Sequence, residues 1–303
     1  MKKKLVFTIF FIIFAIGIFL FTANEYLKRI EQNAIETYLY SIKNESLEYA
    51  LNIEINPVVC KGFIRHQCNI SNIKIYDNKI EISLQNASAK IIDISHDSIE
   101  VAFHIDEITY NSHTNLALLP RKFTYTLNLQ KQDSRLGYVL LNRSIYLDFN
   151  TFDININLDI LLREEIFRNK SILFLLKEWF DNTTPSFYEY SLDTLKININ
   201  SKKIKNESHN PSISLKSIID KYQQENPLFH NDFANHYFNE FIKDTYRLLD
   251  NKIDTLDLSI KRKNQNLVFF NLLSDEASKK KILEIIQVLN SINETYKIDL
   301  QTR

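Results

Sequence analysis

The sequence predicts an α+β protein in which an N-terminal transmembrane helix is followed by an elongated, mainly antiparallel β-sheet with helices packed along one side. The first observation is an uncharged apolar run of eighteen residues, Leu5–Thr22. At 1.5 Å per residue it makes roughly 27 Å of helix, close to the hydrocarbon thickness of a bilayer. The second observation is that apolar and polar residues alternate over much of the remaining chain, which is typical of strands with one buried face. Strands of parallel sheets usually read as continuous apolar runs, so this alternation favours antiparallel pairing.

The N-terminal run is predicted to be an uncleaved anchor spanning residues 5–23. A cleavable signal peptide ends in small residues, whereas Phe21 would occupy the −3 position of a cut after Ala23. The basic residues Lys2–Lys4 precede the run, and positive flanks remain in the cytoplasm. We therefore expect residues 1–4 to form a cytoplasmic tail and the rest of the chain, from Asn24, to lie beyond the membrane.

A helix is expected at residues 24–50, either continuing the anchor or leaving it at Ala23-Asn24, because its apolar residues recur at spacings of three and four. A long region of period two follows it. The first strand is expected over LNIEINPVVC, and a turn at Asp77-Asn78. Further strands are expected at residues 73–75, 80–84, 99–105, 123–129, 145–149 and 152–160, with another turn near residues 135–137.

The pattern changes near residue 161, where we place a soft boundary. A β-rich region, residues 24–160, precedes an α+β region, residues 161–303, built of strand and helix repeats. Helices are expected over residues 161–180, 215–223, 232–249 and 275–292, and strands over 191–199, 252–260 and 266–273. No long Pro-, Gly- or Ser-rich linker separates the halves.

The two cysteines, Cys60 and Cys68, flank Gly62 between two predicted strands. If the body is exported, a disulfide between them is expected to persist and to close a hairpin loop, with Gly62 supplying a turn of positive φ. A metal site is the alternative, but it needs two more ligands and only His66 is near. The spacing differs from the C-x-x-C of redox-active pairs.

Composition points to a bacterial envelope protein. Heavy use of Asn, Ile and Lys with few Gly, Trp and Met is what A/T-rich codons produce. Together with an exported disulfide this predicts a single-pass protein of a Gram-negative inner membrane, with a cytoplasmic N-terminus and a periplasmic body. The 37 basic and 37 acidic residues leave no net charge, so nucleic acid is not an expected partner.

No catalytic residue and no cofactor is predicted. Three glycines in the whole chain exclude a P-loop, a dinucleotide fingerprint and a nucleophile elbow. Histidines at positions 96, 104 and 113 lack metal-binding spacing. No metal site is predicted, although His230, Asp232 and His236 are candidates because Asp232 and His236 lie one helical turn apart. Asp232 is equally placed to cap the following helix.

The opening of the body resembles AsmA-like and related membrane-anchored periplasmic envelope proteins over residues 1–95. The resemblance lies in an anchor, a short helix and the strands LNIEINPVVC, CNISNIKIYDN and KIEISLQNASAKIID. It implies a long, curved sheet with an apolar concave face and a role in lipid handling or envelope maintenance.

Two functions, neither requiring catalysis, follow from these observations. The first is a non-enzymatic scaffold, a bitopic component of a bacterial envelope assembly such as a secretion or flagellar machine, with protein partners in the envelope. The alternative is an AsmA-like module that binds or transports lipid, with phospholipid against an apolar groove lined by Phe and Tyr. In both, residues 5–23 hold the protein to the inner membrane.

Overall fold

The computed structural model describes residues 2–48, 51–63, 65–78, 80–112, 120–133, 138–163, 189–202, 232–263 and 295–303, and the side chains of residues 2–19, 48, 112, 133, 163, 189, 190 and 232–238 lie outside this description. Within these residues there are eleven strands and two helices, and the strand pairs within each unit are antiparallel. The chain forms two compact units. Unit 1 comprises residues 1–91 and 105–113, and unit 2 comprises residues 92–104 and 114–303. The predicted α+β class with a long antiparallel sheet is confirmed in this coarser form.

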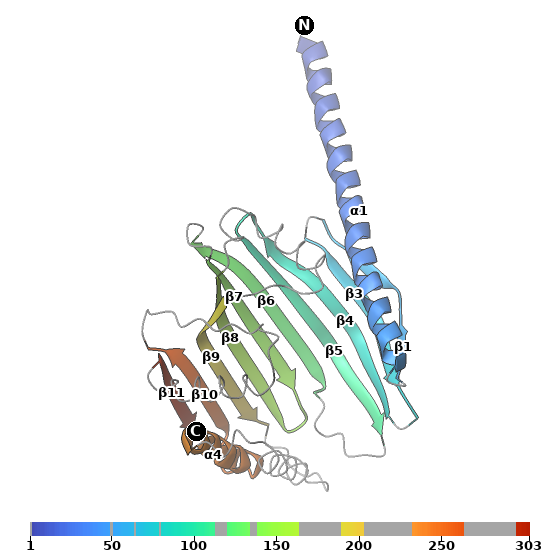
Figure 1. The fold of residues 1–303 in the computed structure, drawn as a ribbon. Coiled ribbons are helices and arrows are strands. Elements are labelled where there is room, and N and C mark those ends of the chain that lie inside the picture. The colour runs from blue at the N-terminus through green and yellow to red at the C-terminus, as the bar shows by residue number, and fades with distance from the viewer. Residues whose placement is uncertain are drawn as a thin grey trace. The chain divides into compact units, whose positions relative to one another are not determined.

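Helix α1 (Lys2–Glu48) is one continuous element, drawn in blue in Figure 1. The helix therefore runs through Ala23-Asn24 without leaving its axis there. Ser46 closes the C-terminal end of the helix. Its hydroxyl donates to the carbonyl oxygen of Lys43 at 2.7 Å, and the amide of Leu51 donates to the carbonyl oxygen of Ser46 at 3.1 Å. These bonds satisfy terminal backbone groups that the helix itself leaves unpaired.

In unit 1 the predicted strand LNIEINPVVC divides into β1 (Asn52–Ile55) and β2 (Val58–Lys61). Proline has no amide hydrogen to donate to a ladder, and Pro57 stands at the break. Both segments pair with β3 (Gln67–Tyr76), which also pairs with β4 (Ile80–Ile94). The predicted turn at Asp77-Asn78 is confirmed, because the amide of Ile80 donates to Asp77 Oδ1 at 2.7 Å.

The core of unit 1 forms where the hairpin of β2 and β3 meets α1. Its buried residues are Val58, Cys68 and Ile70, and Ile35 and Leu39 of the helix pack against them. Helix and hairpin thus share one hydrophobic cluster.

Unit 2 is an antiparallel meander in which each strand from β6 to β11 pairs with the next in sequence (Figure 1). The strands are β6 (Lys122–Asp133), β7 (Tyr138–Asp148), β8 (Phe152–Arg163), β9 (Glu189–Ser201), β10 (Thr255–Arg262) and β11 (Tyr296–Thr302). The unit also holds residues 98–104 of β5 (Ser98–Ser112). Antiparallel pairing of this kind suits strands whose alternation buries one face.

Helix α4 (Asp232–Leu249) begins and ends where the sequence predicts. Its Leu248 is 3% exposed and belongs to a buried cluster with Phe149, Phe152, Ile199, Ile253 and Leu256. The rings of Phe149 and Phe152 stack with centroids 4.6 Å apart. The helix therefore covers one end of the apolar face of this sheet.

Two details differ from the predictions. Strand β8 continues to Arg163, past the residue at which a helix was expected. Strand β11 was not predicted, although Tyr296, Ile298 and Leu300 alternate with polar residues. The predicted helices at 215–223 and 275–292, the strand at 266–273 and the turn near 135–137 lie outside the described residues.

An ion pair joins three strand ends beside the α4 cluster. Asp148 is paired with Lys202 and lies 3.6 Å from Arg121 Nη2, and Lys202 Nζ also donates to Phe149 O at 2.8 Å. Burial acts first to raise the pKa of Asp148, but the hydrogen bond from Lys202 and the charges of Lys202 and Arg121 lower it below its ordinary value. The ionised carboxylate therefore stabilises the folded chain.

We expect Asp148→Asn to lower the free energy of unfolding by about 1.5–3 kcal/mol at pH 7, the usual cost of losing a hydrogen bond to a charged group. Because the folded-state pKa is depressed, this contribution is present above the unfolded value of about 3.9 and is lost as pH falls through the folded value. Urea unfolding of the full-length chain in detergent at pH 7 and pH 3 measures it.

The control is Asp299→Asn, since Asp299 is 44% exposed and pairs with Lys297 at 2.8 Å. An exposed pair of this kind is expected to contribute about 0–1 kcal/mol. Equal losses for the two variants at pH 7, or a loss for Asp148→Asn that persists undiminished at pH 3, would contradict the assignment.

Candidate functional site

The strands of unit 2 carry most of their aliphatic side chains on one face, in rows that cross the sheet. The strand register places two such rows side by side over β6 to β11, and we call them together the aliphatic band. One row is Tyr125, Ile145, Ile156, Ile197, Leu258 and Leu300, and the other is Leu127, Arg143, Leu158, Leu195, Ile260 and Ile298.

The band lies between two buried clusters and is itself only half-buried. On one side is the α4 cluster described above. On the other is a cluster of Ile99, Leu129, Val139, Leu141 and Leu162, all no more than 6% exposed. Every residue of the band has intermediate exposure. The two ends of the apolar face are thus closed by packing, whereas the middle retains accessible hydrocarbon.

Arg143 interrupts the band. Its neighbours across the ladder are Leu127 and Leu158. Its Nε is buried and has no hydrogen-bond partner, and within the described residues no carboxylate is paired with its guanidinium. A buried donor without a partner is costly, and for a charged group the cost is larger. The guanidinium of Arg143 therefore keeps a buried N–H donor for which the described residues supply no acceptor.

The opposite face of the same strands is polar and internally bonded. Directly opposed amide and carboxylate side chains join β7 to β8, β8 to β9 and β9 to β10. The donor and acceptor pairs are Asn142 to Asp159, Asn200 to Asp153 and Asn198 to Asp257, at 2.5, 2.8 and 2.5 Å. The sheet therefore has one polar face and one apolar face.

A second site lies in unit 1, where the disulfide hairpin meets α1. The predicted Cys60–Cys68 disulfide is confirmed, and the two residues are directly opposite each other in β2 and β3. Gly62 in the loop has φ +114°, as predicted, and a Cβ there would lie 2.5 Å from the carbonyl oxygen of Arg65. Glycine is therefore required at this position.

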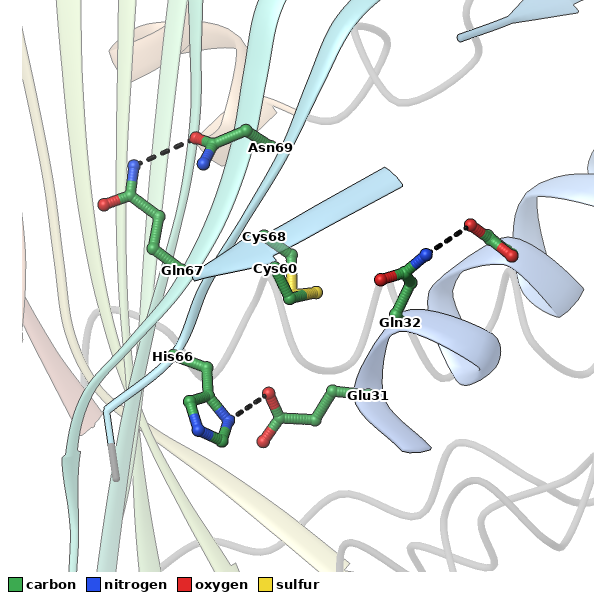
Figure 2. The surroundings of a disulfide bond; sticks show 8 residues. Glu31, Gln32, Cys60, His66, Gln67, Cys68 and Asn69 are labelled. Atoms are coloured by element: carbon green, nitrogen blue, oxygen red, sulfur yellow. Dashed lines mark hydrogen bonds and ion pairs between the residues drawn. A yellow bond between two sulfur atoms is a disulfide. The ribbon is translucent and has the colours of Figure 1, made fainter. Parts of the chain in front are cut away.

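His66 fastens this loop to the helix (Figure 2). It is 2% exposed, and its ring points from the hairpin toward α1 beside the disulfide. Nδ1 lies 2.8 Å from Glu31 Oε2 and Nε2 lies 2.9 Å from Asn24 Oδ1, while Asn24 Nδ2 donates to Gly62 O at 3.3 Å.

Both ring nitrogens of His66 thus lie within hydrogen-bond distance of side-chain oxygens of α1. Glu31 and Asn24 thereby hold the ring of a side chain that is almost fully enclosed by protein. A histidine beside a carboxylate is also the pair used for proton transfer, but here both nitrogens are already bonded within the protein. The cluster is built to hold the loop, and His66 is not placed as a metal ligand.

The other histidines and Asp232 either bond to neighbours of their own or lie wholly or partly outside the described residues. His230 lies outside it, as do the side chains of Asp232 and His236, although Asp232 does begin α4. His96 is exposed and bonds its neighbour Asp97 at 2.8 Å in the turn before β5, and His104 bonds Thr124 Oγ1 at 2.7 Å. His113 lies outside the described residues, within which no cluster able to hold a metal ion occurs.

Sequence reasoning missed the residues that matter most here. Arg143 stands at an apolar position of an otherwise regular alternation, Val139, Leu141, Arg143, Ile145, Leu147, and that single break in pattern was a usable signal. Glu31 and Asn24 carried no such signal, because their partner lies 35 and 42 residues away in the chain.

Among the described residues, neither helix is at once long enough and apolar enough to span a bilayer. The side chains of residues 5–19, which make up most of the predicted anchor, are not among them. Comparison with known proteins adds no assignment. No family model matches the chain, and no curated protein matches it significantly.

We expect Glu31→Gln to accelerate amide hydrogen exchange in residues 60–68 by about tenfold or more. Losing the hydrogen bond between the buried His66 ring and the Glu31 carboxylate costs roughly 1.5–3 kcal/mol, and 1.4 kcal/mol corresponds to a factor of ten. Mass spectrometry of the full-length protein in detergent measures the exchange.

The matched control is Glu36→Gln on the same helix, where Glu36 accepts a bond from Gln32 at 3.1 Å. Its loss should leave exchange in the hairpin unchanged, since surface changes usually stay within about 0.5 kcal/mol. If both variants behave alike, His66 does not fasten the loop through Glu31.

Proposed function

We propose that this protein is held at a bacterial inner membrane by residues 5–23 and binds lipid acyl chains against the aliphatic band. The observation that carries the proposal is the half-buried band itself. A sheet whose apolar face is complete in packing would bury these side chains, as its two ends do. Accessible hydrocarbon on a continuous face marks a surface for an apolar partner.

The dimensions of the band suit an acyl chain. It crosses six strands, from β6 to β11, and neighbouring strands lie about 4.8 Å apart, so it extends roughly 24 Å. One leaflet contributes half of a hydrocarbon core of about 30 Å, which gives an acyl chain of about 15 Å. A chain of that length fits along the band.

The disulfide supports the envelope setting. Disulfides persist in oxidising compartments such as the periplasm and are rare in the cytosol. The Cys60–Cys68 bond, the basic residues Lys2–Lys4 and the apolar run after them agree with export of the body across the inner membrane. In that position the sheet lies in the compartment that borders the membrane lipids.

The scaffold function is the second candidate, and a separate observation favours it. Several large apolar and aromatic side chains of α1 are exposed by 46–66%: Leu20, Phe21, Tyr26, Leu27, Ile30, Tyr38, Tyr40 and Leu47. Aromatic side chains of this kind are enriched in protein interfaces. A protein subunit of the envelope would then contact the helix, leaving the aliphatic band free for lipid.

We expect a photoreactive benzophenone amino acid in place of Leu258 to capture phospholipid in living cells, because that side chain lies in the aliphatic band. The same amino acid in place of Lys196, which is exposed on the opposite face, should capture at least tenfold less lipid. Mass spectrometry of the purified adducts of the full-length protein identifies what was captured.

The two functions give different adducts. Phospholipid at position 258 supports lipid binding. Protein adducts at position 258 without lipid, together with protein adducts at an exposed α1 position such as Tyr38, would exclude the lipid function and favour the scaffold.

A further inference from the structure

We propose that Arg143 is the receptor for the phosphate of an anionic phospholipid whose acyl chain lies along the aliphatic band. This inference rests on the proposed lipid function and names the lipid class and the residue that selects it. The occupant is a phospholipid of the membrane to which the chain is anchored.

The first step of the argument is the chemistry of the side chain. Arginine keeps its charge in proteins, and its planar fork of donors matches the oxygens of a phosphate. In the described part of the chain Arg143 has no carboxylate partner, and its Nε is buried without a hydrogen bond. A phosphate oxygen on the band supplies both the missing acceptor and the missing negative charge.

Comparison with Arg262 sharpens this point. Arg262 lies on the same face, at the edge of the apolar rows opposite Tyr296, and its Nη2 bonds Asp193 at 2.6 Å. The same face therefore provides a carboxylate for Arg262, although Nη1 of Arg262 is, like Nε of Arg143, buried without a hydrogen bond. Arg143 differs because its ladder neighbours on both sides, Leu127 and Leu158, are aliphatic.

The position of Arg143 within the band gives the lipid a direction. From β7 the band continues over β8, β9, β10 and β11, four strand spacings or about 19 Å, and on the other side only over β6. An acyl chain of about 15 Å, half the hydrocarbon core, fits on the longer side with its headgroup at Arg143. Charge and hydrocarbon are thus arranged in the order in which a phospholipid carries them.

The test uses the full-length protein reconstituted in phosphatidylcholine vesicles that contain a small fraction of a lipid with a diazirine in its acyl chain. The probes are phosphatidic acid, the diacylglycerol with the same chains, and the corresponding fatty acid. Adducts within the strands of the band, residues 122–163, 189–202, 255–262 and 296–302, are quantified by mass spectrometry. For the native protein we expect phosphatidic acid to be captured about tenfold more than diacylglycerol, as the loss of a charged hydrogen bond implies.

Arg143→Gln should bring the ratio of phosphatidic acid to diacylglycerol close to one while capture of diacylglycerol stays unchanged. Arg143→Lys, which keeps the charge but not the fork, should give an intermediate ratio. The control Lys196→Gln removes a positive charge from the polar face of the same sheet and should leave the ratio at its native value. A thermal unfolding midpoint for Arg143→Gln at or above that of the native protein, without added lipid, shows that the variant folds.

Different failures have different meanings. If the native protein captures all lipids equally, or prefers the fatty acid, or if Arg143→Gln keeps the native preference, Arg143 is not a phosphate receptor although the band binds lipid. If the native protein captures none of the probes within the band, the proposed function fails as well.

Discussion

The antiparallel register of unit 2 is the constraint on which the rest depends. Side chains alternate between the two faces of a strand, so aligning six strands residue by residue gathers most aliphatic positions on one face and the mutually bonded Asn and Asp side chains on the other. A slip of one residue would reverse the faces of a whole strand. The amide–carboxylate pairs Asn142–Asp159, Asn200–Asp153 and Asn198–Asp257 exist only in this register, and they help to hold it.

The two sites differ in how completely their polar groups are hydrogen-bonded. In unit 1 each ring nitrogen of His66 has an oxygen partner. Gly62 occupies a position where a Cβ atom would clash with the backbone, and a disulfide closes the loop. Such a cluster holds its loop in one arrangement. In unit 2 the guanidinium of Arg143 is held among aliphatic neighbours with a donor unused. A satisfied network fits a structural role, and an unsatisfied cation on an apolar face fits a ligand site.

Much of the fold followed from local patterns. The disulfide, the positive φ of Gly62, the turn at Asp77 and the bounds of α4 were predicted, because each depends on residues close in sequence. The break at Pro57 was missed, although proline's lack of an amide hydrogen could have indicated it. Strand β11 was missed because seven alternating residues at the end of the chain give a weak signal beside longer runs.

By itself, the sequence determined that the segments of period two form antiparallel strands with one apolar face, because strands of parallel sheets usually read as continuous apolar runs. It also determined the disulfide hairpin. Only the tertiary structure decided that Glu31 and Asn24 reach His66 and that Arg143 lies between Leu127 and Leu158 in a half-buried band. The physical reason is range: alternation reports the direction of each side chain, whereas the partner that a charge meets depends on strands and helices brought together from distant parts of the chain.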